Sequence, residues 1–243
     1  MNLNPSRLAL VVAGLTAGAL LAGCGFNIDI DSGDDGPTVT EAYDVESFDH
    51  LELNSAWDVV LEIGPEPTLE VEVSEDFLDD VAVDQDGDRL SLSMDRSGWF
   101  SDWRGTRLAR ITVPSLRKLT VEGAVEVEMD AMTSEQFEVD LRGASTVNLG
   151  QLDLDHLVLK VEGASSVEAD GTITSAEIAA AGASSVDFGG VTIDEVEVDG
   201  AGASSLDLEG AASVSGRLAG ASSISVDDDA STSIKTAGAS SVD

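Results

Sequence analysis

The chain has 243 residues, with 47 acidic and 12 basic side chains and a formal net charge of −35 at pH 7. This charge argues against nucleic acid as a partner, because phosphate groups are met by Lys and Arg. Hydrophobic residues make up 42 % and aromatic residues 4 %, which excludes a disordered acidic chain and predicts a folded domain with a core of Val, Leu, Ile and Ala.

The first 24 residues carry the features of an export signal. Arg7 precedes an apolar run from Leu8 to Leu21, which is shorter than the roughly 20 residues of a transmembrane helix and typical of a secretory signal. The run ends in Leu-Ala-Gly-Cys, which resembles a bacterial lipobox. The resemblance implies a signal peptide over residues 1–23, diacylation of Cys24 and anchoring to a membrane, the outer membrane in a Gram-negative host. The alternative is an ordinary signal peptide with a chance cysteine.

Residues 24–45 are predicted to form an acidic, flexible tether. The stretch is rich in Asp, Gly, Ser and Thr and has no sustained hydrophobic period. Its DSGDDG segment, like the later Asp84–Asp88, resembles part of a calcium loop, but neither continues to the Glu that such a loop needs. We interpret the first as a solvated linker and the second as a turn between strands, and predict no metal site and no cofactor.

The stretch from Arg96 to Arg110 differs from the rest of the chain because it combines aromatic and basic residues. It separates two predicted strands, Leu90–Met94 and Leu108–Val113. Its candidate contact residues are Trp99, Phe100, Trp103 and Arg104. One hypothesis is a binding loop, since aromatic residues and Arg dominate binding hot spots. The other is a hydrophobic lid over an open coil, with the arginines paired to nearby acids.

A short sequence motif built on Gly-Ala-Ser repeats through the second half of the chain. The glycines that open it are Gly123, Gly143, Gly163, Gly182, Gly202, Gly220 and Gly238. Their spacing of 18 to 20 residues predicts a solenoid. From Leu157 to Ala169 every second residue is apolar or small, a period of two that indicates strands rather than helices.

These patterns predict an all-β fold, a single-stranded parallel β-helix over residues 46–243 with its repeats clearest from 119 to 243. We expect about thirteen alternating residues and a connection of about five to seven in each coil. Glycine is expected where the coil bends or where backbones approach closely. Continued alternation would place Ser165 inside and Ser166 outside, whereas a bend at Gly163 would exchange the two faces, so both arrangements stay open.

A family resemblance accompanies the repeats. Phe48–Leu53 has the pattern Phe-x-x-Leu-x-Leu, Ser55–Val60 has a small residue before Asp-Val-Val, and Ile111–Leu119 begins with Ile-Thr-Val-Pro. Followed by Gly-Ala-Ser repeats, this order resembles the family described as putative auto-transporter adhesin, head GIN domain, over about residues 46–243. The resemblance implies a secreted or lipid-anchored parallel β-helix, and its motifs are structural rather than catalytic.

The sequence offers no set of catalytic residues. The two histidines, His50 and His156, are far apart, and the serines lie in repeats without a nucleophile elbow. We therefore predict a non-catalytic, lipid-anchored envelope protein that binds a glycan, another envelope polymer or a protein. The alternatives are a polysaccharide-acting enzyme with paired carboxylates, a scaffold without a ligand of its own, and a flat hydroxyl row from Thr146 to Ser241 for ice or a crystalline surface.

Overall fold

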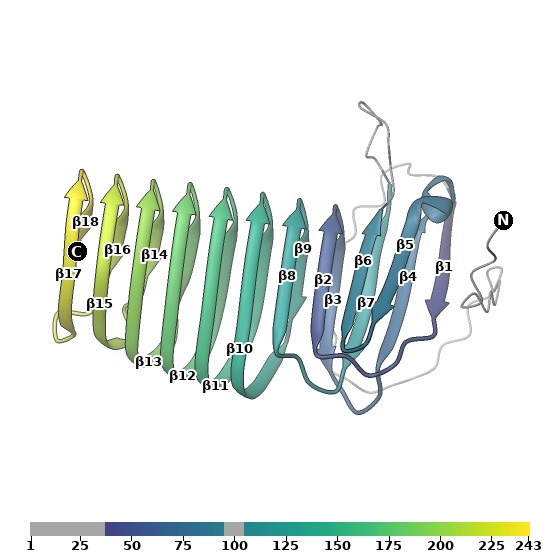
Figure 1. The fold of residues 1–243 in the computed structure, drawn as a ribbon, viewed down its shortest axis with the longest axis horizontal. Helices are drawn as coiled ribbons and strands as arrows, with labels where there is room; N and C mark the ends of the chain where they lie inside the picture. Colours follow the sequence, from purple (N-terminus) through teal and green to yellow (C-terminus); the bar gives the residue numbers. More distant parts are fainter. Residues whose placement is uncertain (1–36, 95–104) are drawn as a thin grey trace.

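The computed structural model describes residues 37–94 and 105–243 (Figure 1). Cys24, the tether up to residue 36 and the candidate loop residues Trp99, Phe100, Trp103 and Arg104 lie outside the described residues. The described chain forms eighteen strands joined in one continuous sheet, with one short 3-10 helix, η1 (Glu75–Asp80). The strands stack as the coils of a parallel β-solenoid, so the predicted fold class is confirmed.

The repeat region is built from long strands that each run around most of a coil. These strands are β10 (Ala131–Gly143), β11 (Thr146–Gly163), β12 (Ser166–Gly182) and β13 (Ser185–Gly202). They pair in parallel and in register, glycine against glycine. Between Gly163 and Ser166 only two residues separate successive strands, so the expected connection of five to seven residues is wrong. The second bend lies inside the strand, where the register shifts between Asn148 and Gln151.

Shorter strands complete the last coils of the stack. They are β14 (Ser205–Asp207), β15 (Ala211–Gly220), β16 (Ser223–Ser225), β17 (Ser231–Gly238) and β18 (Ser241–Val242). In the last described coil, Thr232 and Thr236 stand in register with the buried Val214 and Leu218 of the preceding coil. The end of the stack is therefore more polar than its interior.

The first half of the chain does not stack in sequence order. Its strands are β1 (Thr38–Tyr43), β2 (His50–Ser55), β3 (Asp58–Ile63), β4 (Thr68–Ser74), β5 (Val81–Asp86), β6 (Arg89–Met94), β7 (Arg107–Val113), β8 (Lys118–Gly123) and β9 (Glu126–Met129). The β2–β3 coil lies between β6–β7 and β8–β9, which come later in the chain. The middle coil of the three thus comes first in the chain, and later segments occupy the positions on both sides of it.

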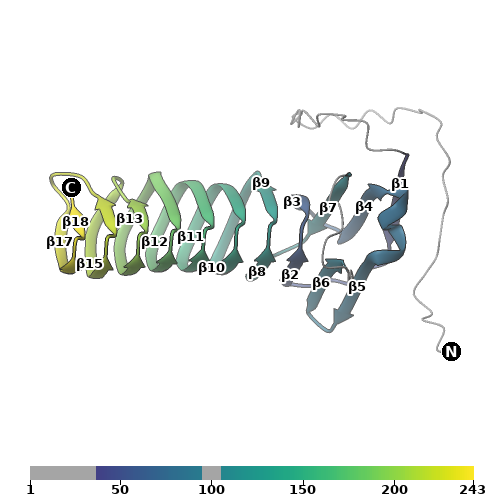
Figure 2. The same cartoon turned by 90° about the horizontal axis from the view of Figure 1, so that it is seen from above.

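The N-terminal end of the solenoid is closed by antiparallel strands (Figure 2). β1 pairs with β4, and β4 pairs with β7. β5 and β6 form a hairpin whose turn includes Gly87, with a φ of 59°. The predicted turn between strands is therefore present within Asp84–Asp88, but it is limited to Gly87 and Asp88, because Asp84–Asp86 end β5.

The core follows the alternation that the sequence showed. Buried Val, Leu and Ile side chains fill the coils, and Trp57, Phe137 and Phe188 are the largest fully buried residues. At the Gly-Ala-Ser corner the alternation continues, because Ser165 is 2 % exposed while Ser166 lies on the outer side. The positions of the two serine rows are thus known: the first serine of each Gly-Ala-Ser motif lies inside the coil and the second outside.

Candidate functional site

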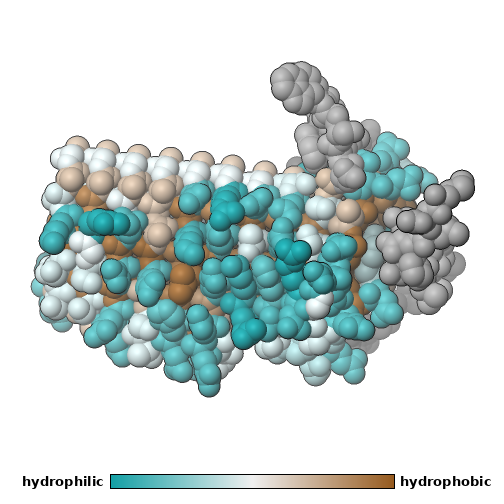
Figure 3. Space-filling model, viewed as in Figure 1, coloured by the Kyte–Doolittle hydropathy of each residue, from teal (hydrophilic) through white to brown (hydrophobic). Residues whose placement is uncertain are grey.

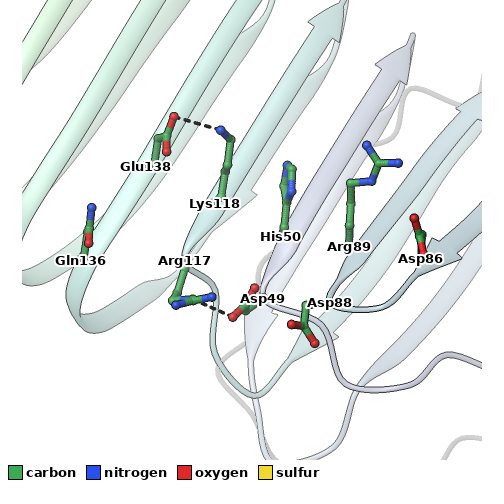
Figure 4. Close-up of a pocket in the computed structure, with 9 residues that line it drawn as sticks. All are labelled: Asp49, His50, Asp86, Asp88, Arg89, Arg117, Lys118, Gln136 and Glu138. Carbon is green, nitrogen blue, oxygen red and sulfur yellow. Dashed lines mark hydrogen bonds and ion pairs between the residues drawn. The ribbon is translucent and has the colours of Figure 1, made fainter.

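The out-of-order stacking brings three distant segments together on one side of the solenoid. His50 on β2 stands in register with Arg89 on β6 and with Lys118 on β8. All three side chains leave the outer side of the same sheet, which continues through β10 and the C-terminal parts of β11, β12 and β13 (Figure 4). We call this sheet, which also includes β15 and β17, the groove sheet.

A polar groove of about 420 Å³ opens at the start of these strands. Its cationic side chains are Arg89, Arg117 and Lys118. Its carboxylates are Asp49, Asp86, Asp88 and Glu138, and His50 and Gln136 complete the lining. Within a chain of net charge −35, the groove is a place where cations nearly balance carboxylates.

Ion pairs fix one wall of the groove. Arg117 Nε donates to Asp49 Oδ2 at 2.7 Å, and the backbone oxygen of Asp49 accepts from the N–H groups of Arg117 and Lys118. Lys118 Nζ lies 3.0 Å from Glu138 Oε1, and this hydrogen bond holds the pKa of Glu138 below its ordinary value. β10 pairs with β8 and belongs to the neighbouring coil, so the Lys118–Glu138 ion pair links two coils.

His50 lies between two cations. Burial is the main cause that lowers the pKa of His50, followed by the charge of Lys118, while Glu52 acts in the opposite direction. The ring is therefore neutral near pH 7. Its Nε2 lies 3.2 Å from the hydroxyl of Thr120, so it takes part in one hydrogen bond there.

Other groove side chains have unused hydrogen-bonding capacity. Among residues 37–94 and 105–243, the carboxylates of Asp86 and Asp88 and the side-chain amide of Gln136 make no hydrogen bond or ion pair. Arg89 uses one N–H toward Glu52 at 3.3 Å. Carboxylates that accept and an amide and guanidinium that donate, side by side, match a ligand rich in hydroxyl groups.

Sequence reasoning did not find this groove. The sequence shows His50 as an isolated histidine, and it places seven of the twelve basic residues between Arg89 and Lys118. Nothing in it shows that β2 would insert between β6 and β8. The signal that could have pointed to the site was the run of basic residues in an acidic chain. His50 and His156 are not brought together, since His156 starts the groove-sheet part of a later coil, beside Ser175 at 2.9 Å.

The sequence-predicted loop is not tested, since it lies outside the described ranges. Its neighbours are known: Met94 ends β6 before it and Arg107 begins β7 after it. The groove is at the other end of β6, where Arg89 begins the strand. At about 3.3 Å per residue, the two ends of β6 are separated by roughly 17 Å.

The sheet on the other side of the coils, which includes β9, β14 and β16, carries different outward side chains. Its outer rows hold the hydroxyl row that the sequence predicted and a row with Glu168, Asp187 and Asp207 in register. In the part of the chain that the structure describes, no group of three or more His, Cys, Asp or Glu side chains is arranged to hold a metal ion. Figure 3 shows the groove sheet, where hydrophilic side chains stand over patches of hydrophobic surface and small residues line the upper edge.

Residues 47–230 match the family described as putative auto-transporter adhesin, head GIN domain. The match covers most of the sequence, and the chain belongs to this family. The resemblance noted from the strand motifs is therefore confirmed. The family is described as adhesins rather than enzymes, and its description indicates a surface or exported protein.

Solved structures share the fold at low sequence identity. A putative adhesin from Bacteroides fragilis has a TM-score of 0.76 and 17 % identity, over 85 % of this chain and 96 % of its own. A putative lipid binding protein from Parabacteroides distasonis has a TM-score of 0.67 and 17 % identity, over 86 % and 96 %. A putative adhesin from Parabacteroides merdae has a TM-score of 0.65 and 14 % identity, over 86 % and 96 %. No curated protein matches the chain.

For the described ranges, no helix combines the length and the apolar character that crossing a membrane requires.

Proposed function

We propose that this protein is a non-catalytic, lipid-anchored adhesin of the cell envelope that binds a glycan in the polar groove. The groove supports this function because Asp86, Asp88 and Gln136 face it with free hydrogen-bonding groups beside Arg89. A sugar offers hydroxyl groups that donate to carboxylates and accept from guanidinium and amide groups. These groups can bind a ligand without first breaking an interaction within the protein.

The charge of the molecule restricts the class of ligand. Three cationic side chains and four carboxylates line the groove, and the whole chain carries −35. A strongly anionic polymer would be repelled by the surrounding field. A glycan without many acidic groups fits both the balanced groove and its acidic surroundings.

Binding to immobilised glycans tests this function. We expect the full chain, purified in detergent, to bind members of an array of neutral, amino and acidic glycans that includes peptidoglycan fragments. The double substitution Asp86→Asn and Asp88→Asn removes both free carboxylates but retains side chains that suit the hairpin turn. It is expected to weaken binding at least tenfold, since hydrogen bonds to charged groups contribute about 1.5–3 kcal/mol each.

A matched control makes the same chemical change far from the groove. Asp228 and Asp229 are exposed in the turn between β16 and β17, and changing both to Asn should leave binding unchanged. Equal weakening by the two double variants would point to overall charge instead of the groove. An array with no bound glycan at low or high salt would refute the proposal.

Lipid anchoring by Cys24 is the second part of the proposal and rests on the sequence. The change Cys24→Ala removes the thiol that would be acylated. In the native host we expect labelled palmitate in the wild-type protein, and with Cys24→Ala neither label nor recovery in the membrane fraction. Trp99, Phe100, Trp103 and Arg104 remain a proposed second contact, argued from their composition alone.

A further inference from the structure

The groove sheet carries a second hollow further along the solenoid. It has a volume of about 180 Å³ and lies over β11, β12 and β13. Val158 and Ala179 are the short outward side chains at its floor, and Lys160, Glu177 and Glu197 stand around it. The hollow exists because Ala179 occupies a position where the paired residue on each side, Lys160 or Asp199, has a longer charged side chain.

The second hollow adjoins the first. Glu138 belongs to the lining of the groove and Lys160 to that of the second hollow. The carboxylate oxygen Oε1 of Glu138 lies 3.0 Å from Lys118 Nζ and 3.7 Å from Lys160 Nζ. β10 and β11, which carry Glu138 and Lys160, are neighbouring strands. An ion-paired chain of three residues therefore forms the boundary between the hollows.

We infer that the two hollows form one binding track, along which a linear polysaccharide lies parallel to the solenoid axis. This inference rests on the glycan-binding function proposed above. The track crosses β6, β2, β8, β10, β11, β12 and β13 in that order. Six spacings of about 4.8 Å give a length of roughly 29 Å, so the site suits a chain of several sugars rather than a single one.

The lining of the track specifies the class of polysaccharide. Val158 and Ala179 offer a short apolar floor for the C–H face of a sugar ring, with carboxylates beside it for hydroxyl groups. In the second hollow Lys160 faces Glu177 and Glu197, and Asp199 is paired with Arg217. Carboxylates therefore still outnumber cations. The ligand is therefore a linear polysaccharide that is neutral or carries amino groups, and uronic acid polymers are excluded by repulsion.

Affinity as a function of chain length tests the track. The probes are chito-oligosaccharides, their de-N-acetylated forms and cello-oligosaccharides, each as di-, tetra- and hexasaccharide, with oligogalacturonates as acidic comparators. We expect neutral or amino probes to bind, with the hexasaccharide at least about tenfold tighter than the disaccharide, since a few added hydrogen bonds suffice for that factor.

Two variants test whether the second hollow contributes to binding independently of the groove. Ala179→Gln fills the second hollow with a polar side chain and should remove the gain with length while leaving disaccharide affinity unchanged. Ser215→Gln introduces the same side chain at an exposed outward position of β15, one strand beyond the second hollow, and should change neither. Thermal unfolding of both variants reports whether the fold is intact.

The outcomes distinguish the track from the groove function. If disaccharides bind as tightly as hexasaccharides, or if Ala179→Gln has no effect on the longest probe, the track is wrong and groove binding stands. Tighter binding of oligogalacturonates would overturn the ligand class. If none of the neutral and amino probes binds at any length, the glycan-binding function fails together with the inference.

Discussion

Gly163 and Gly182 are paired residues on β11 and β12, and a Cβ on Gly182 would overlap the carbonyl oxygen of Gly163. Gly182 also has a φ of 91°, which side-chain-bearing residues rarely adopt. The same relation recurs between the glycines of successive coils. Each Gly-Ala-Ser motif therefore begins with glycine for two independent reasons. The chain bends sharply there, and the backbones of neighbouring coils approach closely.

Gly182→Ala tests both reasons together. We expect it to lower the free energy of unfolding by about 3 kcal/mol or more, because strain and overlap with a backbone atom both oppose the methyl group. Urea unfolding measures the change. Gly87→Ala is the control, since Gly87 has a φ of 59° but open space around its Cβ position, and it should cost only about 1 kcal/mol. Equal losses would show that stacking does not matter.

The serines of the inner row are buried and need hydrogen-bond partners within the protein, whereas the serines of the outer row can bond to water. Ser184 is 2 % exposed and its hydroxyl donates to the backbone oxygen of Ala181 at 2.7 Å. We predict that Ser184→Ala lowers the free energy of unfolding by about 1 kcal/mol. Ser185, the next residue, is exposed on the outer row, and Ser185→Ala should stay within about 0.5 kcal/mol. The thermal unfolding of the two variants is the measurement.

The fold could be predicted from the sequence where the pattern is local. Alternation around Gly163 specified the strands, the inward side of Ser165 followed once the alternation was known to continue, and the glycine spacing specified the coils. The long strands could not be foreseen, because the bend between Asn148 and Gln151 is a register shift inside one strand and not a separate loop.

The site was less predictable than the fold. His50, Arg89 and Lys118 meet only because β2 inserts between strands that follow it in the chain. Such a pairing depends on contacts between distant segments, and no periodicity within β2 encodes it. The aromatic loop drew the prediction because hot-spot composition is visible in a sequence, whereas the placement of single charged residues on neighbouring coils is not.

The position of His50 between Arg89 and Lys118 makes part of the stability depend on pH. The pKa of His50 is lowered in the folded chain, mainly by burial, so between that pKa and about 6.5 the unfolded state binds a proton that the folded state does not. Stability therefore rises with pH through this window, is fully present above about pH 6.5 and is lost as the pH falls through the folded-state pKa.

The variant His50→Gln isolates this contribution. The difference in melting temperature between wild type and variant should shift in favour of the variant on acidification from pH 7 to pH 5. Titration of carboxylates that do not interact with His50 affects both proteins alike and cancels in the difference, whereas Glu52 and Asp49 act on the pKa of His50 itself. A constant difference across this range would contradict the lowered pKa. NMR titration of the His50 ring gives the same answer directly.

The row of Glu168, Asp187 and Asp207 opposes folding through like-charge repulsion. The three carboxylates stand in register on paired strands, and no Lys or Arg forms an ion pair with them in the described part of the chain. Like charges directly opposite each other destabilise a sheet by a few tenths of a kcal/mol. Asp187→Asn should therefore raise the free energy of unfolding by about 0.5 kcal/mol at low ionic strength.

High salt should remove this gain, because the screening length falls to about 3 Å at 1 M salt. The control is Asp199→Asn on the groove sheet, where Asp199 Oδ2 lies 2.6 Å from Arg217 Nη2. Removing that attraction should change stability in the opposite direction, and salt should shrink this effect as well. Urea unfolding of the three proteins at low and high NaCl measures all four differences. If both variants shift stability in the same direction, the effect comes from net charge and not from the neighbours of each carboxylate.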